Sequence, residues 1–311
     1  MVPEQLLENS NQLLYEMITI TGKTKLVGLI GQPVSHSLSP IMHNAAYEEM
    51  GLDWCYLAMQ CEKQNLEQLI EVLRFVDCIG LNVTIPHKQE VIKTCNKLTK
   101  IAEEIQAVNT LIPEKNNQWI GANTDVEGFL KPLKSHNLMN KNVIIIGCGG
   151  SARAVVMGLK GLNIKELIVI GRNKSSLDIF IKNMKNLLSN KLISIKGISN
   201  KDINIKSYIR EADLIINTTP IGMNDLNIEQ DNIPLGRQIW DNLSNYTILY
   251  DLIYTPRPTK WLKLGQQKDC FIIDGLDMLV EQGALSIRLW SGFNDVPIKI
   301  MKSSAEKHLM V

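Results

Sequence analysis

Short apolar runs alternate along the chain with segments in which apolar residues recur at the spacing of a helix. The runs predict strands at residues 25–30, 54–59, 80–83, 109–113, 143–147, 166–170, 214–217, 248–251 and 271–273. The helical spacing predicts helices at residues 40–50, 66–75, 99–106, 151–162, 175–188 and 278–290. Strands that alternate with helices in this way predict an α/β protein with parallel sheets that are covered on both faces.

Three stretches stand outside this alternation. Residues 1–20 are mildly amphipathic, with acidic residues and no Lys or Arg, and we expect a helical extension there. Residues 183–206 are rich in Asn and Lys but broken by apolar residues, which predicts a helix end, a short strand and loops. Residues 224–231 are expected to form a loop. The regular alternation of strand and helix therefore begins near residue 25.

The composition is typical of a globular protein with two domains of ordinary size. The chain has 311 residues, of which 45% are hydrophobic and 21% charged. A net charge of +1 gives no electrostatic reason to expect a nucleic-acid or anionic-membrane partner. No apolar stretch approaches the roughly 20 residues that span a bilayer. The N-terminus lacks the features of a signal or transit peptide, so we expect a cytoplasmic protein.

The cysteines and histidines form no pattern typical of a metal site or a disulfide framework. The six cysteines show no Cys-x-x-Cys spacing, and several lie in apolar segments, where a thiol packs as a small hydrophobe. Free thiols in a reducing compartment fit this usage best. The five histidines do not pair with cysteine or carboxylate at metal-ligand spacings, so we expect no metal site.

A glycine-rich turn joins a predicted strand to a predicted helix within residues 143–154. The sequence matches Gly-x-Gly-x-x-Ala, in which the glycines permit a tight turn and the approach of a pyrophosphate to the backbone. The helix N-terminus then faces the phosphates with its partial positive charge. A tight turn without a ligand is the alternative, but the strand–turn–helix context favours dinucleotide binding. The expected binding residues are Gly147, Gly149, Gly150, Ser151 and Ala152.

The next predicted strand ends at Gly171, and the residues that follow bear on the choice of dinucleotide. An NAD-selective site usually has an Asp or Glu here to bind the ribose 2′-hydroxyl. This chain has Arg172, Asn173 and Lys174 instead. The guanidinium of Arg172 can stack on the adenine and pair with a 2′-phosphate. The sequence therefore favours NADP over NAD, with a solvated surface arginine as the alternative.

Two serines precede the first predicted helix. Ser37 and Ser39 are two residues apart, so both hydroxyls face one way in extended backbone. Hydroxyls beside a helix N-terminus suit an anionic group such as a carboxylate. The alternative is that Ser39 only caps the helix, with Pro40 at the first helical position.

Lys88 and Asp125 are a candidate proton-transfer pair. Residues 82–88 follow a predicted strand, where ligands bind in open α/β sheets. Pro86 is expected to begin a helix with Lys88 in its first turn, where a cation opposes the helix dipole. Asp125 is expected near the start of another helix, where an acid is favourable. Taken alone, a solvent-facing lysine and a first-turn acid are equally good interpretations.

Eight motifs together resemble those of the shikimate dehydrogenase family, in the family's order and over nearly the whole chain. They lie at residues 37–40, 82–88, 107–110, 123–128, 147–152, 217–223, 251–254 and 274–282. The resemblance implies NADPH-linked reduction of 3-dehydroshikimate to shikimate, in the route to chorismate and aromatic amino acids.

The family's architecture implies boundaries for this chain. An α/β substrate domain is expected over residues 25–123, completed by C-terminal helices at 277–311. A Rossmann NADP-binding domain is expected over residues 124–276, with the active site in the cleft between the domains. The resemblance does not extend to residues 1–24, which we treat as an N-terminal extension. The family includes both monomers and homodimers.

The resemblance also implies roles for individual residues. Lys88 and Asp125 are the catalytic pair. The serines bind the substrate carboxylate and several other side chains hold ring hydroxyls, so that the substrate-binding set is Ser37, Ser39, Thr84, Asn109, Tyr254 and Gln282. The cofactor contacts extend from the glycine-rich turn and residues 172–174 to Thr218, Leu252 and Gly275.

Two departures from the family and three rival functions accompany this interpretation. The neighbours of Arg172 differ from those usual in the family, and Asp277 replaces a usual glycine, where it either changes the local charge or caps the last predicted helix. A quinate or dual quinate/shikimate dehydrogenase is the nearest rival. A non-catalytic NADP-binding protein and a folate-linked dehydrogenase are the others.

Overall fold

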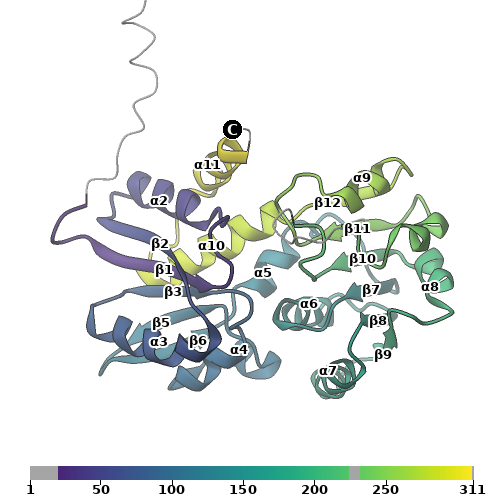
Figure 1. Ribbon diagram of the computed structural model, residues 1–311, viewed down its shortest axis with the longest axis horizontal. Coiled ribbons are helices and arrows are strands. Elements are labelled where there is room, and N and C mark those ends of the chain that lie inside the picture. Colours follow the sequence, from purple (N-terminus) through teal and green to yellow (C-terminus); the bar gives the residue numbers. More distant parts are fainter. Residues whose placement is uncertain (1–19, 224–231, 310–311) are drawn as a thin grey trace, which may run out of the picture.

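Two six-stranded sheets lie side by side, with helices around each (Figure 1). The computed structural model describes residues 20–223 and 232–309. The expected helical extension at residues 1–20 therefore falls almost wholly outside the described residues, and the expected loop at 224–231 falls outside them entirely.

The first sheet has the order β2-β1-β3-β5-β6-β4. Its strands are β1 (Lys25–Gly31), β2 (Trp54–Gln60), β3 (Gly80–Val83), β4 (Lys97–Leu98), β5 (Thr110–Glu114) and β6 (Gln118–Ala122). The helices between them are α2 (Ser39–Glu49), α3 (Leu66–Phe75) and α4 (Lys100–Ile105), with 3₁₀ turns η1 (Lys63–Asn65) and η2 (Glu90–Thr94). Helix α5 (Asp125–Leu130) then leads to the second sheet.

The second sheet is wholly parallel, with the order β12-β11-β10-β7-β8-β9. Its strands are β7 (Asn142–Ile146), β8 (Glu166–Gly171), β9 (Ser194–Ser199), β10 (Leu214–Asn217), β11 (Ile248–Asp251) and β12 (Phe271–Ile273). The connecting helices are α6 (Gly150–Lys160), α7 (Lys174–Leu187), α8 (Ile205–Glu211) and α9 (Lys260–Gln266), with the 3₁₀ turn η3 (Arg237–Asn242). The chain ends in α10 (Leu276–Ser291) and α11 (Ile298–Leu309).

Alternate residues of the central strand β7 are buried in two separate cores. Val143 and Ile145 belong to the core under α6 and α7, whereas Ile144 and Ile146 belong to the core under α8 and α9. A strand buried on both faces has no polar alternation, which is why it reads as a continuous apolar run. The expected parallel sheet covered on both faces is confirmed for this half of the protein.

The first sheet departs from the expected parallel arrangement. Strand β5 pairs antiparallel with both β3 and β6. Lys115, Asn116 and Asn117 join β5 to β6, and the two asparagines have positive φ, a conformation that asparagine tolerates. This three-residue turn sends the chain straight back along β5, so no crossover helix is needed.

Helices α10 and α11 return to the first sheet. Val280, Ala284 and Ile287 of α10 and Met301 of α11 share a buried core with Met42 of α2. In Figure 1, α10 and α5 run between the two sheets. The end of the chain therefore completes the packing of its beginning.

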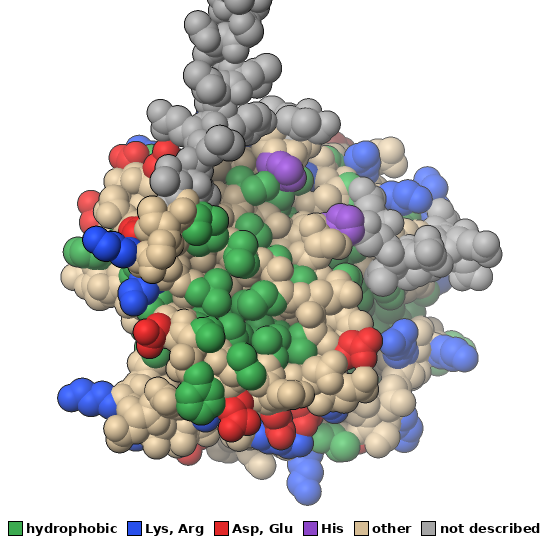
Figure 2. Space-filling model, turned by 60° about the vertical axis from the view of Figure 1, so that its left-hand side comes forward, with side chains coloured by type: hydrophobic (Ala, Val, Ile, Leu, Met, Phe, Trp, Pro, Cys, Tyr) green, Lys and Arg blue, Asp and Glu red, His purple; other side chains and the backbone are tan. Residues whose placement is uncertain are grey.

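Seen from the side of the first sheet, hydrophobic side chains gather in the middle of the molecular face (Figure 2). Leu57 on the edge strand β2 and Phe75 at the end of α3 are among the exposed large apolar residues of this half. Among residues 20–223 and 232–309, no helix is both long and apolar enough to cross a membrane.

Gly80 should be intolerant of a side chain because α10 packs directly on it. A Cβ at this position would lie 2.4 Å from ring atoms of Trp290. We expect Gly80→Ala to destabilise the protein by about 1–3 kcal/mol, as overpacking does, measured by urea unfolding. Gly22→Ala is the matched control, since an added Cβ there meets no heavy atom within 4 Å. Equal unfolding free energies for the two variants would contradict this packing.

Candidate active site

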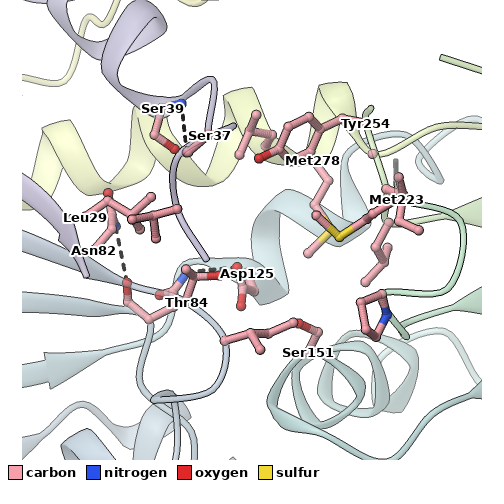
Figure 3. Close-up of a pocket in the computed structure, with 18 of the residues that line it drawn as sticks. Leu29, Ser37, Ser39, Asn82, Thr84, Asp125, Ser151, Met223, Tyr254 and Met278 are labelled. Atoms are coloured by element: carbon pink, nitrogen blue, oxygen red, sulfur yellow. Dashed lines mark hydrogen bonds between the residues drawn. The ribbon is translucent and has the colours of Figure 1, made fainter. Parts of the chain in front are cut away.

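A cavity of about 250 Å³ lies between the two sheets and is bounded on one side by α10 (Figure 3). The first sheet contributes the loops that follow β1 and β3, and the second contributes the loops that follow β10 and β11. All eight residues of the predicted catalytic and substrate-binding sets line it: Ser37, Ser39, Thr84, Lys88, Asn109, Asp125, Tyr254 and Gln282. Segments far apart in the sequence thus bring these polar side chains to one cavity.

Lys88 and Asp125 form an ion pair inside this cavity. The Nζ atom of Lys88 lies 2.6 Å from Oδ2 of Asp125, and their side chains are only 11% and 7% exposed. The ammonium also lies within 3.4 Å of the Ser151 hydroxyl, at the start of α6. The interpretations of Lys88 as a solvent-facing lysine and Asp125 as only a first-turn acid are therefore wrong. Asp125 does begin α5, as expected.

The expectation that Pro86 begins a helix is wrong. Residues 85–86 and 88–89 form turns, and the 3₁₀ turn η2 begins only at Glu90. The carbonyl of Lys88 accepts a hydrogen bond of 2.7 Å from the backbone N–H of Val108. That bond links the turn to the segment before β5, so the backbone of Lys88 does not continue into a helix. The turn instead points the lysine side chain at Asp125.

Asn109 holds the second carboxylate oxygen of Asp125. Its Nδ2 donates to Oδ1 of Asp125 at 2.8 Å and to the Thr124 hydroxyl at 2.9 Å. Its Oδ1 accepts the backbone N–H of Thr124 at 2.8 Å, which fixes which end of the amide faces the carboxylate. Gln282 lies at 3.4 Å from the same Nδ2. Each oxygen of the carboxylate therefore has its own donor.

The two serines sit near Tyr254 at the opposite end of the cavity (Figure 3). Ser37 accepts the backbone N–H of Ser39 at 3.2 Å. Ser39 is the first residue of α2 and not its cap, because Leu38 takes the N-cap position and makes no side-chain cap. Burial raises the pKa of Tyr254, and its hydrogen bond with Ser37 opposes that rise. Tyr254 therefore stays a neutral hydroxyl beside the serines.

The glycine-rich turn has the shape that a dinucleotide requires. Gly147 has φ +109°, and a Cβ there would lie 2.5 Å from Oγ1 of Thr218. Gly149 is the extended N-cap residue of α6, and an added Cβ meets no heavy atom within 4 Å. Gly275, like Gly147, has no room for a side chain, because an added Cβ would lie 2.1 Å from the backbone oxygen of Leu252. Bare backbone beside an eleven-residue helix N-terminus fits a pyrophosphate.

The predicted cofactor residues divide into three groups. Four of them line the cavity: Ser151, Thr218, Leu252 and Gly275. Gly147, Gly149, Gly150 and Ala152 form the turn and helix start beside it. Residues 172–174 do not line the cavity and lie exposed after β8. Asn173 there caps α7 by accepting the N–H of Ser176 at 2.9 Å.

The site also contains residues that the sequence analysis did not single out for a role. Asn82, Met223 and Met278 all line the cavity. Asn82 is buried, and its Oδ1 accepts the hydroxyl hydrogen of Tyr56 at 2.8 Å. A polar residue in the middle of a buried strand was the available signal for Asn82.

Asp277, the departure from the family, lies in the first turn of α10 and forms an ion pair of 2.5 Å with Lys302 of α11.

A parallel sheet with a glycine-rich turn, facing a second α/β domain across a cavity that holds a buried Lys–Asp pair, is the arrangement of a two-domain dinucleotide-dependent dehydrogenase. Family models described as "Shikimate dehydrogenase substrate binding domain" and "Shikimate 5'-dehydrogenase C-terminal domain" match residues 29–111 and 275–306. The chain belongs to the shikimate dehydrogenase family, as the sequence motifs predict.

Individual relatives cover almost the whole chain. The shikimate dehydrogenase (NADP(+)) of Prochlorococcus marinus (strain MIT 9312) is 47% identical over 93% of this chain and 100% of its own. The shikimate dehydrogenase (NADP(+)) of Nostoc sp. is 43% identical over 93% of this chain and 99% of its own. A shikimate dehydrogenase crystallised with NADP+ is 34% identical, with a TM-score of 0.81 over 94% of this chain and 98% of its own. The Thermus thermophilus enzyme, crystallised with NADP(H) and shikimate, has a TM-score of 0.76 and 27% sequence identity. The match covers 91% of this chain and 99% of its own.

Asp251, fully buried at the end of β11, should make stability fall as pH rises. Burial raises the pKa of Asp251 to about 7, against the opposing hydrogen bonds from Thr259, Ile253 and Asn217. Because the unfolded carboxyl titrates near 4, the folded state binds more protons between about pH 4 and 7. The free energy of unfolding contributed by this group therefore decreases across that window.

Urea unfolding of Asp251→Asn and wild type at several pH values tests this. The variant should lose part of the downward slope between about pH 4 and 7. Asp295→Asn, which alters an exposed carboxyl, is the control and should follow the wild-type curve. A constant difference between Asp251→Asn and wild type at every pH would contradict the assignment.

Proposed function

We propose that this protein is an NADP-dependent shikimate dehydrogenase, which reversibly reduces the 3-keto group of 3-dehydroshikimate to the hydroxyl of shikimate. The observation that carries the proposal is the buried Lys88–Asp125 pair, 2.6 Å apart, between the cavity and the start of α6. Ketone reduction needs a proton donor and a positive charge beside the oxygen that becomes an alkoxide. Lys88 supplies both at one position.

NADP is the cofactor that the residues fit. The turn from Gly147 to Ala152 and the N-terminus of α6 would hold the pyrophosphate, with Arg172 at the 2′-phosphate. Thr218, Leu252 and Gly275 would contact the part of the dinucleotide that reaches the cavity. The chemistry supplied by the bound dinucleotide is hydride transfer, and every other requirement falls to side chains of this chain.

The cavity offers separate partners for the carboxylate and the hydroxyls of the substrate. Ser37 and Ser39, with the Tyr254 hydroxyl beside them, bind the carboxylate. Thr84 after β3, Asn109 before β5 and Gln282 in α10 hold the ring hydroxyls. Directional donors and acceptors on opposite sides of a small cavity fix which ring face is turned toward the cofactor side.

Lys88 acts as the general acid in reduction. Its ammonium donates a proton to the carbonyl oxygen as the hydride arrives at the carbon, and the neutral amine takes that proton back in the reverse reaction. Asp125 holds the amine of Lys88 in position and accepts a hydrogen bond from a substrate hydroxyl. Because Asn109 holds one oxygen of Asp125, the other is left directed at Lys88.

This activity suits a place in chorismate and aromatic amino-acid biosynthesis. All six cysteines are free thiols, which supports the predicted cytoplasmic location. The expected monomer or homodimer stays a prediction.

The activity itself is tested by following absorbance at 340 nm with shikimate or quinate against NADP or NAD. We expect kcat/KM to be highest for shikimate with NADP. Faster turnover of quinate would favour the quinate dehydrogenase alternative. No NADP reduction with shikimate at high pH would refute the proposal and favour a non-catalytic protein.

Lys88→Ala should lower kcat by about 10²–10⁴-fold, the usual contribution of a general acid–base group. The dissociation constant of NADPH, measured by its fluorescence, should change little because Lys88 is assigned to the substrate. Lys93→Ala is the matched control, since Lys93 is an exposed lysine of η2 paired with Glu90. A Lys88→Ala rate within about threefold of wild type would show that Lys88 is not the proton donor.

A further inference from the structure

A buried polar network adjoins the Lys88–Asp125 pair and is joined to it through Asn109. Asn82 of β3, Thr110 of β5 and Ser286 of α10 are all buried. They come from three elements that meet only in the folded protein. Polar groups in a core are costly unless each finds a partner, so the network constrains all three side chains at once.

The hydrogen bonds of the network run in one direction, toward Asp125. Tyr56 donates its hydroxyl hydrogen to Oδ1 of Asn82 at 2.8 Å, which leaves the Nδ2 end of that amide to donate onward. Nδ2 lies 3.1 Å from the hydroxyl of Thr110. Thr110 donates to Oδ1 of Asn109 at 2.9 Å, and Asn109 donates to Oδ1 of Asp125 at 2.8 Å. Bonds aligned in this way polarise one another and strengthen the last bond, from Asn109 to Asp125.

Ser286 is the point at which α10 joins this network. Its hydroxyl donates to the carbonyl of Gln282, one helical turn earlier, at 3.0 Å. The oxygen is then free to accept from Nδ2 of Asn82 at 2.9 Å, the shortest of the three contacts made by that nitrogen. The same oxygen lies 3.1 Å from the hydroxyl of Thr110. Ser286 therefore contacts both Asn82 and Thr110 without lining the cavity.

We propose that Ser286 is a positioning residue for the catalytic pair, which it orients through Asn82, Thr110 and Asn109. Without its oxygen, Nδ2 of Asn82 loses its shortest acceptor and is left with the Thr110 hydroxyl and the carbonyl of Asn109. The amide then turns toward these two groups and displaces the Thr110 hydroxyl that bonds Asn109. The Asn109 amide then loses one of the two close contacts that hold its Oδ1 and thereby keep its Nδ2 on Asp125, and the backbone N–H of Thr124 is the other. The inference rests on the proposed function, since it concerns the residues assigned there to proton transfer.

The variant Ser286→Ala tests this role with little risk to folding, because alanine is the better helix former. We expect kcat for shikimate to fall about threefold to tenfold, the usual range for one net hydrogen bond. KM for NADP should stay at the wild-type value, because no atom of the network touches the glycine-rich turn. Ser291→Ala is the matched control: Ser291 lies on the same helix and bonds the carbonyl of Ile287 at 2.8 Å, outside the network.

A double-mutant cycle separates positioning from a general loss of stability. Tyr56→Phe removes the donor on the other side of Asn82, and it also provides a second variant should Ser286→Ala fold poorly. If both residues act through Asn82, their combined effect on kcat is smaller than the product of the single effects. The inference would be overturned if the effects of Ser286→Ala and Tyr56→Phe on kcat simply multiplied in the double variant. It would also be overturned if Ser286→Ala had the same kcat as the control Ser291→Ala.

The failure of this inference is distinct from the failure of the proposed function. An active wild type with an unchanged Ser286→Ala kcat overturns only the role of Ser286. A wild type that does not reduce NADP with shikimate overturns both. A Ser286→Ala protein that loses thermal stability but keeps its kcat per folded molecule also contradicts positioning, because a structural role alone predicts that result.

Discussion

A carboxylate held between an ammonium and an amide is the interaction on which this site depends. Taking two charges out of water costs several kcal/mol per ion, and their attraction offsets that cost only when the remaining lone pairs are satisfied. Asp125 meets this condition, since Lys88 holds one oxygen and Asn109 the other. The surrounding elements must therefore fix three side chains from separate parts of the chain to within hydrogen-bond distance.

The same requirement couples the catalytic pair to the glycine-rich turn. A Cβ on Gly150 would lie 3.0 Å from Cβ of Lys88, and the Ser151 hydroxyl lies 3.4 Å from the lysine Nζ. A larger residue at the start of α6 would therefore push against the base of the Lys88 side chain. The small residue at this position serves two purposes, because bare backbone also suits a pyrophosphate. Cofactor binding and lysine position share one structural constraint.

Much of this arrangement could be predicted from the sequence, and the exceptions have physical causes. Continuous apolar runs and the Gly147–Ala152 turn are local signals, so the strands and the cofactor side were found. Lys88 and Asp125 were ambiguous alone and became specific only as part of ordered motifs. The turn at Lys88 was mispredicted because a bond to Val108, distant in sequence, decides its backbone. Ser286 was missed because a single serine in an apolar helix carries no signal until its partners are known.

Helix α10 explains how these long-range requirements are met together. Met278, Gln282, Ser286 and Trp290 follow one another at intervals of four, so they form a single stripe along the helix. The stripe begins in the cavity, passes Asn109 and Asn82, and ends on Gly80 at the start of β3. Since Gly80 and Asn82 lie on the same short strand, the contact of Trp290 sets the distance at which Ser286 meets Asn82. One helix thus contacts both strand β3 and Asn109, which bonds Asp125, so the packing of α10 on β3 bears directly on the residues that surround the catalytic pair.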